Sequence, residues 1–180
     1  LQSMKLTMAP FCRAQQLKCL KKDLVEIVGG PEDILYIDPP YTNRQYGPNY
    51  HLYETLVKYD NPEVNGVAGL RDWKSESRSD FCSKEGFVRT MTQVLAKTKA
   101  SWVFFSYSTD GLLSRSEVEA LFKSSPRVRK VEVATKTQKR FRSAKANTEV
   151  ELDKSGLLEL LFTVSLKKKQ KNDSRNSIHI

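Results

Sequence analysis

Residues 34–41 read Ile-Leu-Tyr-Ile-Asp-Pro-Pro-Tyr, an apolar run that ends in an acid, two prolines and an aromatic ring. Four apolar residues bounded by turn formers are typical of a buried parallel strand. The two prolines fix φ and hold the backbone extended beyond that strand. We therefore expect Ile34–Ile37 to be a strand of an α/β sheet, with residues 38–41 as a rigid segment that leaves it.

The composition of this rigid segment favours one kind of chemistry. Proline has no backbone N–H to donate, so the local carbonyls remain available as acceptors. A carboxylate and a neighbouring carbonyl can then accept both protons of one amino group and turn its nitrogen lone pair toward an electrophile. Tyr41 offers a flat face on which a base can stack. The pattern favours alkylation of an exocyclic amine on a nucleobase, and an ordinary strand-ending turn is the alternative.

Length and composition narrow the class of protein. A chain of 180 residues with 39% hydrophobic content fits one domain with its own core. It contains no run of 18 apolar residues, which argues against a membrane span, and no signal peptide is visible. Three cysteines without metal-like spacing fit a reducing cytosol, so we expect a cytoplasmic protein without a metal site.

The positive charge is concentrated in the second half of the chain. The formal net charge is +9, and residues 127–145 hold eight Lys or Arg against the single acid Glu132. Residues 165–180 add five more basic residues against Asp173. A local excess of this kind favours a polyanionic partner, with nucleic acid as the leading candidate over a solvated charged face.

The rest of the chain alternates between helical and strand-like patterns. We expect helices at about residues 13–28, 49–59 and 84–97 and from Ser114 onward, and strands near residues 102–108, 131–133 and 158–164. Asn49 is the expected cap of the second helix, and Ser114–Glu117 has the form of a capping box. Cys19 lies on the apolar face of the first predicted helix, which suggests a role in core packing.

This order of elements predicts an α/β fold. Residues 60–82 form a long polar connection, which in a compact domain is usually functional or disordered. The last two predicted strands are joined without room for a crossover helix, so we expect them to be antiparallel. The sheet should therefore be mostly parallel, with a final antiparallel strand.

A family resemblance covers residues 33–166. Residues 38–46 together with 49–55 resemble the adenine-specific DNA methyltransferases of bacterial restriction–modification systems, and within them the FokI-type modification enzymes. The resemblance continues through Lys58-Tyr59-Asp60, Gly69-Leu70-Arg71, Ser106–Gly111, Lys139–Ser143 and Glu159–Phe162.

The resemblance implies a Rossmann-like fold that uses S-adenosylmethionine and flips adenine out of the duplex. In such a site Asp38 and the carbonyl of Pro39 would accept from the 6-amino group, Pro40 would keep the segment rigid, and Tyr41 would stack on the flipped ring. Asp38 also lies where the family holds the methionine part of the cofactor. Methyl transfer would be a direct displacement without a covalent cysteine, and no cysteine adjoins the motif in the sequence.

The resemblance also marks residues that are expected to contact double-stranded DNA: Arg44, Tyr46, Asn49, Tyr50, His51, Arg71, Lys139, Arg140 and Arg142. The last three lie between two predicted strands, where a hairpin can reach the phosphate backbone. The alternatives are a polar helix start for His51, a packed ring for Tyr50 and a solvated turn for the basic hairpin.

The resemblance is incomplete at its N-terminal side. About thirty residues precede the motif, and Gly29-Gly30 follows a predicted helix rather than the strand that a Phe-x-Gly-x-Gly cofactor loop requires. We expect residues 1–166 to be the C-terminal, motif-bearing half of a methyltransferase catalytic domain, and residues 167–180 to be a basic, disordered tail. A missing N-terminal half with the cofactor loop and a target-reading domain would then be a partner. Methylation of an RNA base amine and an inactive DNA-binding remnant remain alternatives.

Overall fold

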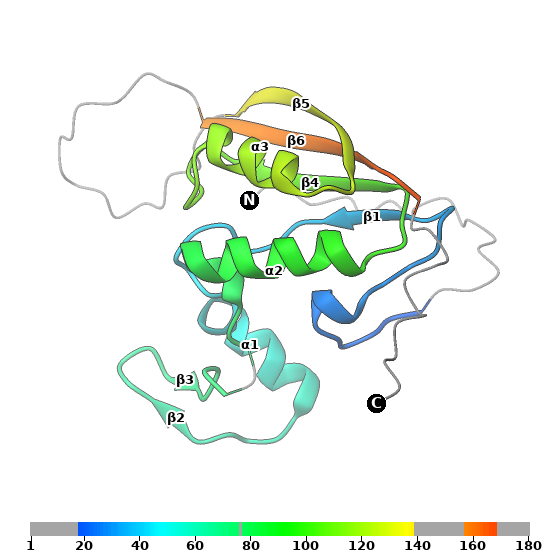
Figure 1. The fold of residues 1–180 in the computed structure, drawn as a ribbon. Helices are drawn as coiled ribbons and strands as arrows, with labels where there is room; N and C mark the ends of the chain where they lie inside the picture. The colour runs from blue at the N-terminus through cyan, green and yellow to red at the C-terminus, as the bar shows by residue number, and fades with distance from the viewer. Residues whose placement is uncertain (1–17, 76, 139–156, 169–180) are drawn as a thin grey trace, which may run out of the picture.

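A four-stranded mixed sheet lies in the upper part of the view in Figure 1. The computed structural model describes residues 18–75, 77–138 and 157–168. Across the sheet the strand order is β1-β4-β6-β5. These strands are β1 (Ile34–Ile37), β4 (Trp102–Ser108), β5 (Val128–Gln138) and β6 (Leu157–Leu166).

The strand directions confirm the expected sheet. β1 is parallel to β4, with Ile34 opposite Trp102 and Ile37 opposite Phe105. β6 is antiparallel to both of its neighbours, β4 and β5. The strands β1, β4 and β5 therefore share one direction, and only the final strand runs against them. The prediction that the last two strands pair antiparallel is confirmed.

Two helices cover one face of this sheet, and both begin where the sequence predicts. α2 (Lys84–Lys97) matches the predicted helix, and the Ser83 side chain accepts a hydrogen bond from the Gly86 N–H at its start. α3 (Arg115–Ser124) starts with the predicted capping box, in which Ser114 and Glu117 bond reciprocally to each other's backbone N–H.

The core lies between these helices and the sheet. Phe105 of β4 is fully buried at its centre, with ring centroids 5.7 Å from Phe87 of α2, 5.6 Å from Phe122 of α3 and 6.2 Å from Phe162 of β6. Edge and tilted ring pairs of this kind stabilise a core beyond the area they bury. One aromatic cluster therefore joins both helices to two strands.

The opposite face of the sheet is less covered in the described part of the chain. Ile34 and Tyr36 are 64% and 61% exposed, and Trp102 on β4 is also exposed. The expectation that Ile34–Ile37 is a buried strand is therefore wrong for these residues, although it does form a strand parallel to its neighbour. The physical reason is that the described residues leave this face of β1 uncovered, whereas strands of parallel sheets usually have both faces covered.

The first predicted helix is not formed where the structure describes it. Residues 13–17 lie outside the described part, and residues 18–28 contain only a 3-10 turn, Leu24–Glu26, capped by Asp23. Leu20 is 60% exposed and Cys19 is exposed, so the predicted core role of Cys19 is wrong. A short amphipathic helix is marginal without a surface to pack against.

The second helix begins earlier than predicted. α1 (Tyr46–Lys58) has Gln45 as its N-cap, so Asn49 lies inside the helix rather than at its cap. Pro48 falls in the first turn, where its missing N–H has no helical partner in any case. The helix ends at Tyr59, which adopts the left-handed conformation with φ 50°.

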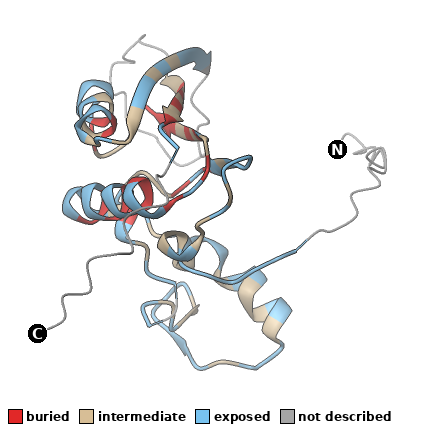
Figure 2. Ribbon diagram, turned by 45° about the vertical axis from the view of Figure 1, so that its right-hand side comes forward, coloured by how far each residue is buried: buried red, intermediate tan, exposed pale blue. Residues whose placement is uncertain are grey.

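The polar connection that follows α1 contains structure that the sequence did not predict. It forms a small hairpin of β2 (Val64–Asn65) and β3 (Leu70–Arg71), and later a 3-10 turn, η2 (Asp80–Cys82). Neither α1 nor this hairpin contains a buried residue, as Figure 2 shows by its colours. We refer to α1 together with residues 60–78 as the arm. No helix in the described ranges is long and apolar enough to span a membrane.

Candidate functional site

The motif residues leave the carboxyl end of β1, the edge at which α/β sheets bind ligands. Pro39 is buried, Pro40 and Tyr41 are half-buried, and Asp38 is exposed. The buried and rigid prolines therefore hold a carboxylate in solvent at a fixed place. A carboxylate held in this way is accessible to a ligand.

The turn after β4 holds Tyr41. The Leu112 N–H donates to the Tyr41 carbonyl at 2.9 Å, and the rings of Tyr41 and Tyr107 lie 5.2 Å apart. The hydroxyl of the buried Tyr107 in turn donates to the Leu113 carbonyl at 2.9 Å and accepts from the Leu113 N–H at 2.8 Å. Tyr107 thus holds the turn through its hydroxyl and contacts the ring of Tyr41.

The electrostatic surroundings keep the Tyr41 hydroxyl protonated. Burial raises the pKa of this phenol, and the carboxylates of Glu159 and Asp38 raise it further. Burial followed by the charge of Asp38 also raises the pKa of Tyr46. The charge of Asp38 therefore raises the pKa of both Tyr41 and Tyr46, the first two tyrosines that follow it along the chain.

A second set of contacts attaches the motif segment to η2. The Cys82 thiol lies 3.9 Å from the Pro40 carbonyl and 3.4 Å from the Arg44 carbonyl, to which it can donate. Burial raises the pKa of this thiol, so it stays protonated. The Gln45 amide accepts from the Ser79 N–H at 2.7 Å and donates to the Ser79 carbonyl at 3.0 Å. A cysteine does therefore adjoin the motif, but only in space, and nothing in the sequence signals it.

Gly111 allows the turn to close over Tyr107. A Cβ atom at this position would lie 2.2 Å from both Cζ and the hydroxyl oxygen of Tyr107. We expect Gly111→Ala to lower the free energy of unfolding by about 1–3 kcal/mol, because the overpacked ring must shift. Urea denaturation measures this change. Gly30→Ala is the matched control, since its nearest contact is an ordinary 3.5 Å, and equal losses in the two variants would contradict the prediction.

The predicted DNA contacts that follow the motif lie on and beside α1. Arg44, Asn49, Tyr46 and Tyr50 are all exposed. The ring centroids of Tyr46 and Tyr50 lie 5.5 Å apart. The exposure of Tyr50 argues against the packed ring that was its alternative. The ring centroid of Tyr53 lies 6.2 Å from that of Tyr50, so Tyr53 extends the line of exposed tyrosines on α1. Tyr53 was not predicted as a contact, although its spacing of three residues from Tyr50 places both on one helix face. Lys139, Arg140 and Arg142 lie outside the described residues, so their predicted role stays a prediction.

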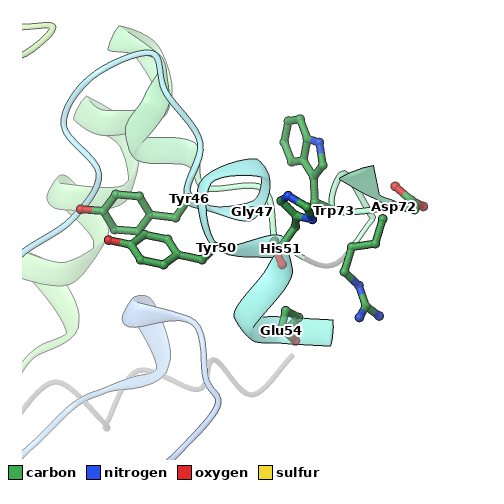
Figure 3. A pocket seen from close by; sticks show the side chains of 9 residues that line it. Tyr46, Gly47, Tyr50, His51, Glu54, Asp72 and Trp73 are labelled. Atoms are coloured by element: carbon green, nitrogen blue, oxygen red, sulfur yellow. The ribbon is translucent and has the colours of Figure 1, made fainter. Parts of the chain in front are cut away.

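Four of the predicted contacts share one cavity of about 170 Å³ in the arm, shown in Figure 3. Its lining consists of Tyr46, Gly47, Tyr50, His51, Glu54, Arg71, Asp72, Trp73 and Ser77. Glu54 and Trp73 are the chemically distinctive members that sequence reasoning missed. Trp73 lies outside every quoted motif, and Glu54 lies within the resembling residues 49–55 but had no expected role there.

Arg71 is engaged within the arm. Its guanidinium donates to both carboxylate oxygens of Asp60, at 3.1 and 2.6 Å, and to the Thr55 hydroxyl at 3.3 Å. The hydrogen bond and charge of Arg71 lower the pKa of the exposed Asp60 carboxyl. The contact of Arg71 with DNA stays a prediction, and in the structure this side chain fastens β3 to α1.

The chain is similar to known proteins over most of its length. The model of the D12 class N6 adenine-specific DNA methyltransferases matches residues 5–120, more than half of the chain. The type II methyltransferase M.FokI of Planomicrobium okeanokoites is 46% identical over 101 residues, which cover 56% of this chain and 15% of the relative.

Two further relatives match over longer stretches. The type II methyltransferase M.NlaIII of Neisseria lactamica is 36% identical over 122 residues, which are 68% of this chain and 34% of the relative. The modification methylase StsI of Streptococcus sanguinis is 28% identical over 167 residues, which are 92% of this chain and 25% of the relative. The chain thus spans about a third or less of the length of these relatives. No solved structure gives a significant match.

Proposed function

The chain belongs to the D12 class of N6 adenine-specific DNA methyltransferases. We propose that residues 38–41 form the site at which the 6-amino group of adenine in DNA is methylated. The observation that carries this proposal is the exposed Asp38 carboxylate, held at the carboxyl end of β1 beside the supported ring of Tyr41. We also propose a cytoplasmic location.

In the proposed mechanism these residues bind and orient one amino group. The Asp38 carboxylate and the Pro39 carbonyl accept from the two N–H bonds of an adenine that has been flipped out of the duplex. The ring of Tyr41 stacks on the base and restricts its plane. Holding the nitrogen in line with the methyl carbon supplies most of the acceleration. The protonated thiol of Cys82 steadies the segment and takes no covalent part.

S-adenosylmethionine is the proposed methyl donor, and it supplies an electrophilic methyl group on a sulfonium. Asp38 fits this cofactor because its exposed carboxylate can take the ammonium of the methionine part. The described residues offer one wall of such a site, since β1 is the edge of their sheet. We propose that a segment outside the described residues supplies the second wall, with a Gly-rich turn and a group for the ribose.

The uncovered side of the sheet supports such a further segment. Ile34, Tyr36 and Trp102 present apolar surface beside the open edge of β1. An exposed strand edge invites pairing unless another element covers it. We propose that the covering element is the N-terminal half of a methyltransferase catalytic domain, on the same polypeptide or on a second one.

One experiment tests activity and substrate together. The chain is combined with a polypeptide that carries the cofactor loop of an M.FokI-type relative, and is then incubated with methyl-labelled S-adenosylmethionine and either duplex DNA or RNA. We expect label in N6-methyladenine from DNA only. Label in RNA would favour the RNA base-amine alternative, whereas a stable complex that binds DNA without methylating it would favour the inactive remnant.

A calorimetric titration tests the division of the cofactor site. We expect the chain alone to bind S-adenosylmethionine with a dissociation constant weaker than about micromolar, because half of a cleft loses most contacts but still bears the entropy cost of immobilising the ligand. Micromolar binding without a second polypeptide would contradict the proposed division.

DNA binding should depend on salt through the basic hairpin. We expect replacement of Lys139, Arg140 and Arg142 by alanine to flatten the plot of log K against log salt by up to about three phosphate contacts. The matched control removes three exposed basic residues from the helices α2 and α3: Arg89, Lys97 and Lys123. Equal slopes in the parent chain and the hairpin variant would show that the hairpin does not touch DNA.

A further inference from the structure

The cavity in the arm is separate from residues 38–41 and has a chemistry of its own. We propose that it binds an unpaired DNA base that carries an amino group, with Trp73 as the stacking surface and Glu54 as the acceptor. This base is distinct from the target adenine at Tyr41. The inference rests on the proposed function, because it takes DNA to be the substrate.

The position of Trp73 is fixed by a close approach to α1. A Cβ atom at Gly47 would lie 2.8 Å from the Cβ and 3.1 Å from the Cε3 of Trp73, so only a glycine leaves room for the indole against the first turn of the helix. Trp73 is half-buried and lines the same cavity as His51 (Figure 3). Part of a rigid aromatic surface therefore borders the cavity, as stacking on a base requires.

The charges of the lining favour a base over a phosphate. The side chain of Arg71 is only 10% exposed, and its guanidinium is already bonded to the Asp60 carboxylate. Glu54 and Asp72 line the same cavity, and the negative charges of these residues would repel a phosphate. A carboxylate instead accepts well from the exocyclic amine of cytosine or adenine.

Of these two carboxylates, Glu54 is the better placed to accept from a ligand. The Asp72 carboxylate accepts from the Lys74 N–H at 3.0 Å and from the Ser75 hydroxyl at 3.1 Å, which commits it to its own turn. The Oε1 atom of Glu54 lies 3.4 Å from the Lys58 ammonium. This pair orients the carboxylate, and at the surface such pairs are weak enough to admit a competing donor.

The cavity adjoins the motif through α1. Tyr46, the first residue of the helix, lines the cavity and lies five positions after Tyr41. The preceding Gln45 is fastened to Ser79 by two hydrogen bonds, so the segment between the two sites is held at both ends. In the proposal, a DNA strand whose adenine lies at Tyr41 reaches the cavity along this short segment.

The fluorescence of Trp73 tests the proposal directly. Trp102→Phe leaves Trp73 as the single tryptophan, and three labelled single-stranded oligonucleotides of equal length are titrated into this variant: oligo(dC), oligo(dT) and an abasic chain. Cytosine and thymine are pyrimidines of similar size, but only cytosine presents an amine at position 4. We expect oligo(dC) to quench Trp73 strongly, oligo(dT) weakly and the abasic chain not at all.

Variants separate stacking from acceptance, with the anisotropy of the labelled oligonucleotide as the measure of binding. We expect Trp73→Leu to weaken oligo(dC) binding about tenfold, and Trp73→Phe to restore part of the loss because it returns an aromatic face. Glu54→Gln should abolish the preference for oligo(dC) over oligo(dT), while Glu132→Gln on β5 should leave it unchanged.

Three outcomes would overturn the inference. Equal quenching by the abasic chain would show that the cavity binds the phosphate backbone. DNA binding by anisotropy without quenching by any base would leave the DNA-binding proposal intact and remove the base pocket. Absence of both signals would overturn DNA binding itself, and the pocket with it.

Discussion

Replacement of Asp38 by alanine should lower the rate of adenine methylation at least about a hundredfold in the reconstituted enzyme. In the proposed site the Asp38 carboxylate is one of two acceptors, and its loss leaves the 6-amino group with the Pro39 carbonyl alone. Because Asp38 is exposed, the free energy of unfolding should hardly change. The rate of N6-methyladenine formation and a urea denaturation curve measure the two effects.

A carboxylate elsewhere in the fold provides the control for this variant. Glu132→Ala on β5 removes an exposed acid that pairs with Lys130 at 2.7 Å, and it should leave methylation unchanged. If Asp38→Ala methylates at the parental rate, the assignment of Asp38 to the catalytic site is wrong. Slow methylation accompanied by a large loss of stability would instead mean that Asp38 supports the fold.

Phe105→Ala should lower the free energy of unfolding by about 3–5 kcal/mol, a large part of the stability of an ordinary domain. The ring has no exposed surface, and its neighbours belong to both covering helices and to β6. Its removal opens a cavity where these elements meet. Urea denaturation followed by circular dichroism measures the loss.

Phe104 is the matched control for this prediction, because it is the same residue type one position earlier on the same strand. Its side chain points to the opposite face of the sheet and is only half-buried. Phe104→Ala should therefore cost clearly less than Phe105→Ala. Similar losses in both variants would mean that the two faces of β4 contribute equally, contrary to the described packing.

The elements that the sequence alone determined are those with local, short-range causes. The capping box at Ser114–Glu117 satisfies backbone N–H groups within four residues, and α2 begins at Ser83 by the same mechanism. The alternation in residues 158–164 identified β6, since one face of that strand is buried. The Asp-Pro-Pro-Tyr segment was predicted for the same reason, because proline restricts its own backbone whatever surrounds it.

Only the tertiary structure decided the supports of the site and the form of the arm. The contact of Tyr41 with Tyr107 and that of Pro40 with Cys82 join residues 66 and 42 positions apart, and no short-range rule predicts such pairs. The predicted helix at 13–28 failed over residues 18–28 for a related reason. Its apolar stripe is a correct local signal, but Leu24 and Val25 pack against the core from a 3-10 turn while Leu20 stays exposed, so the stripe is not buried as one helical face.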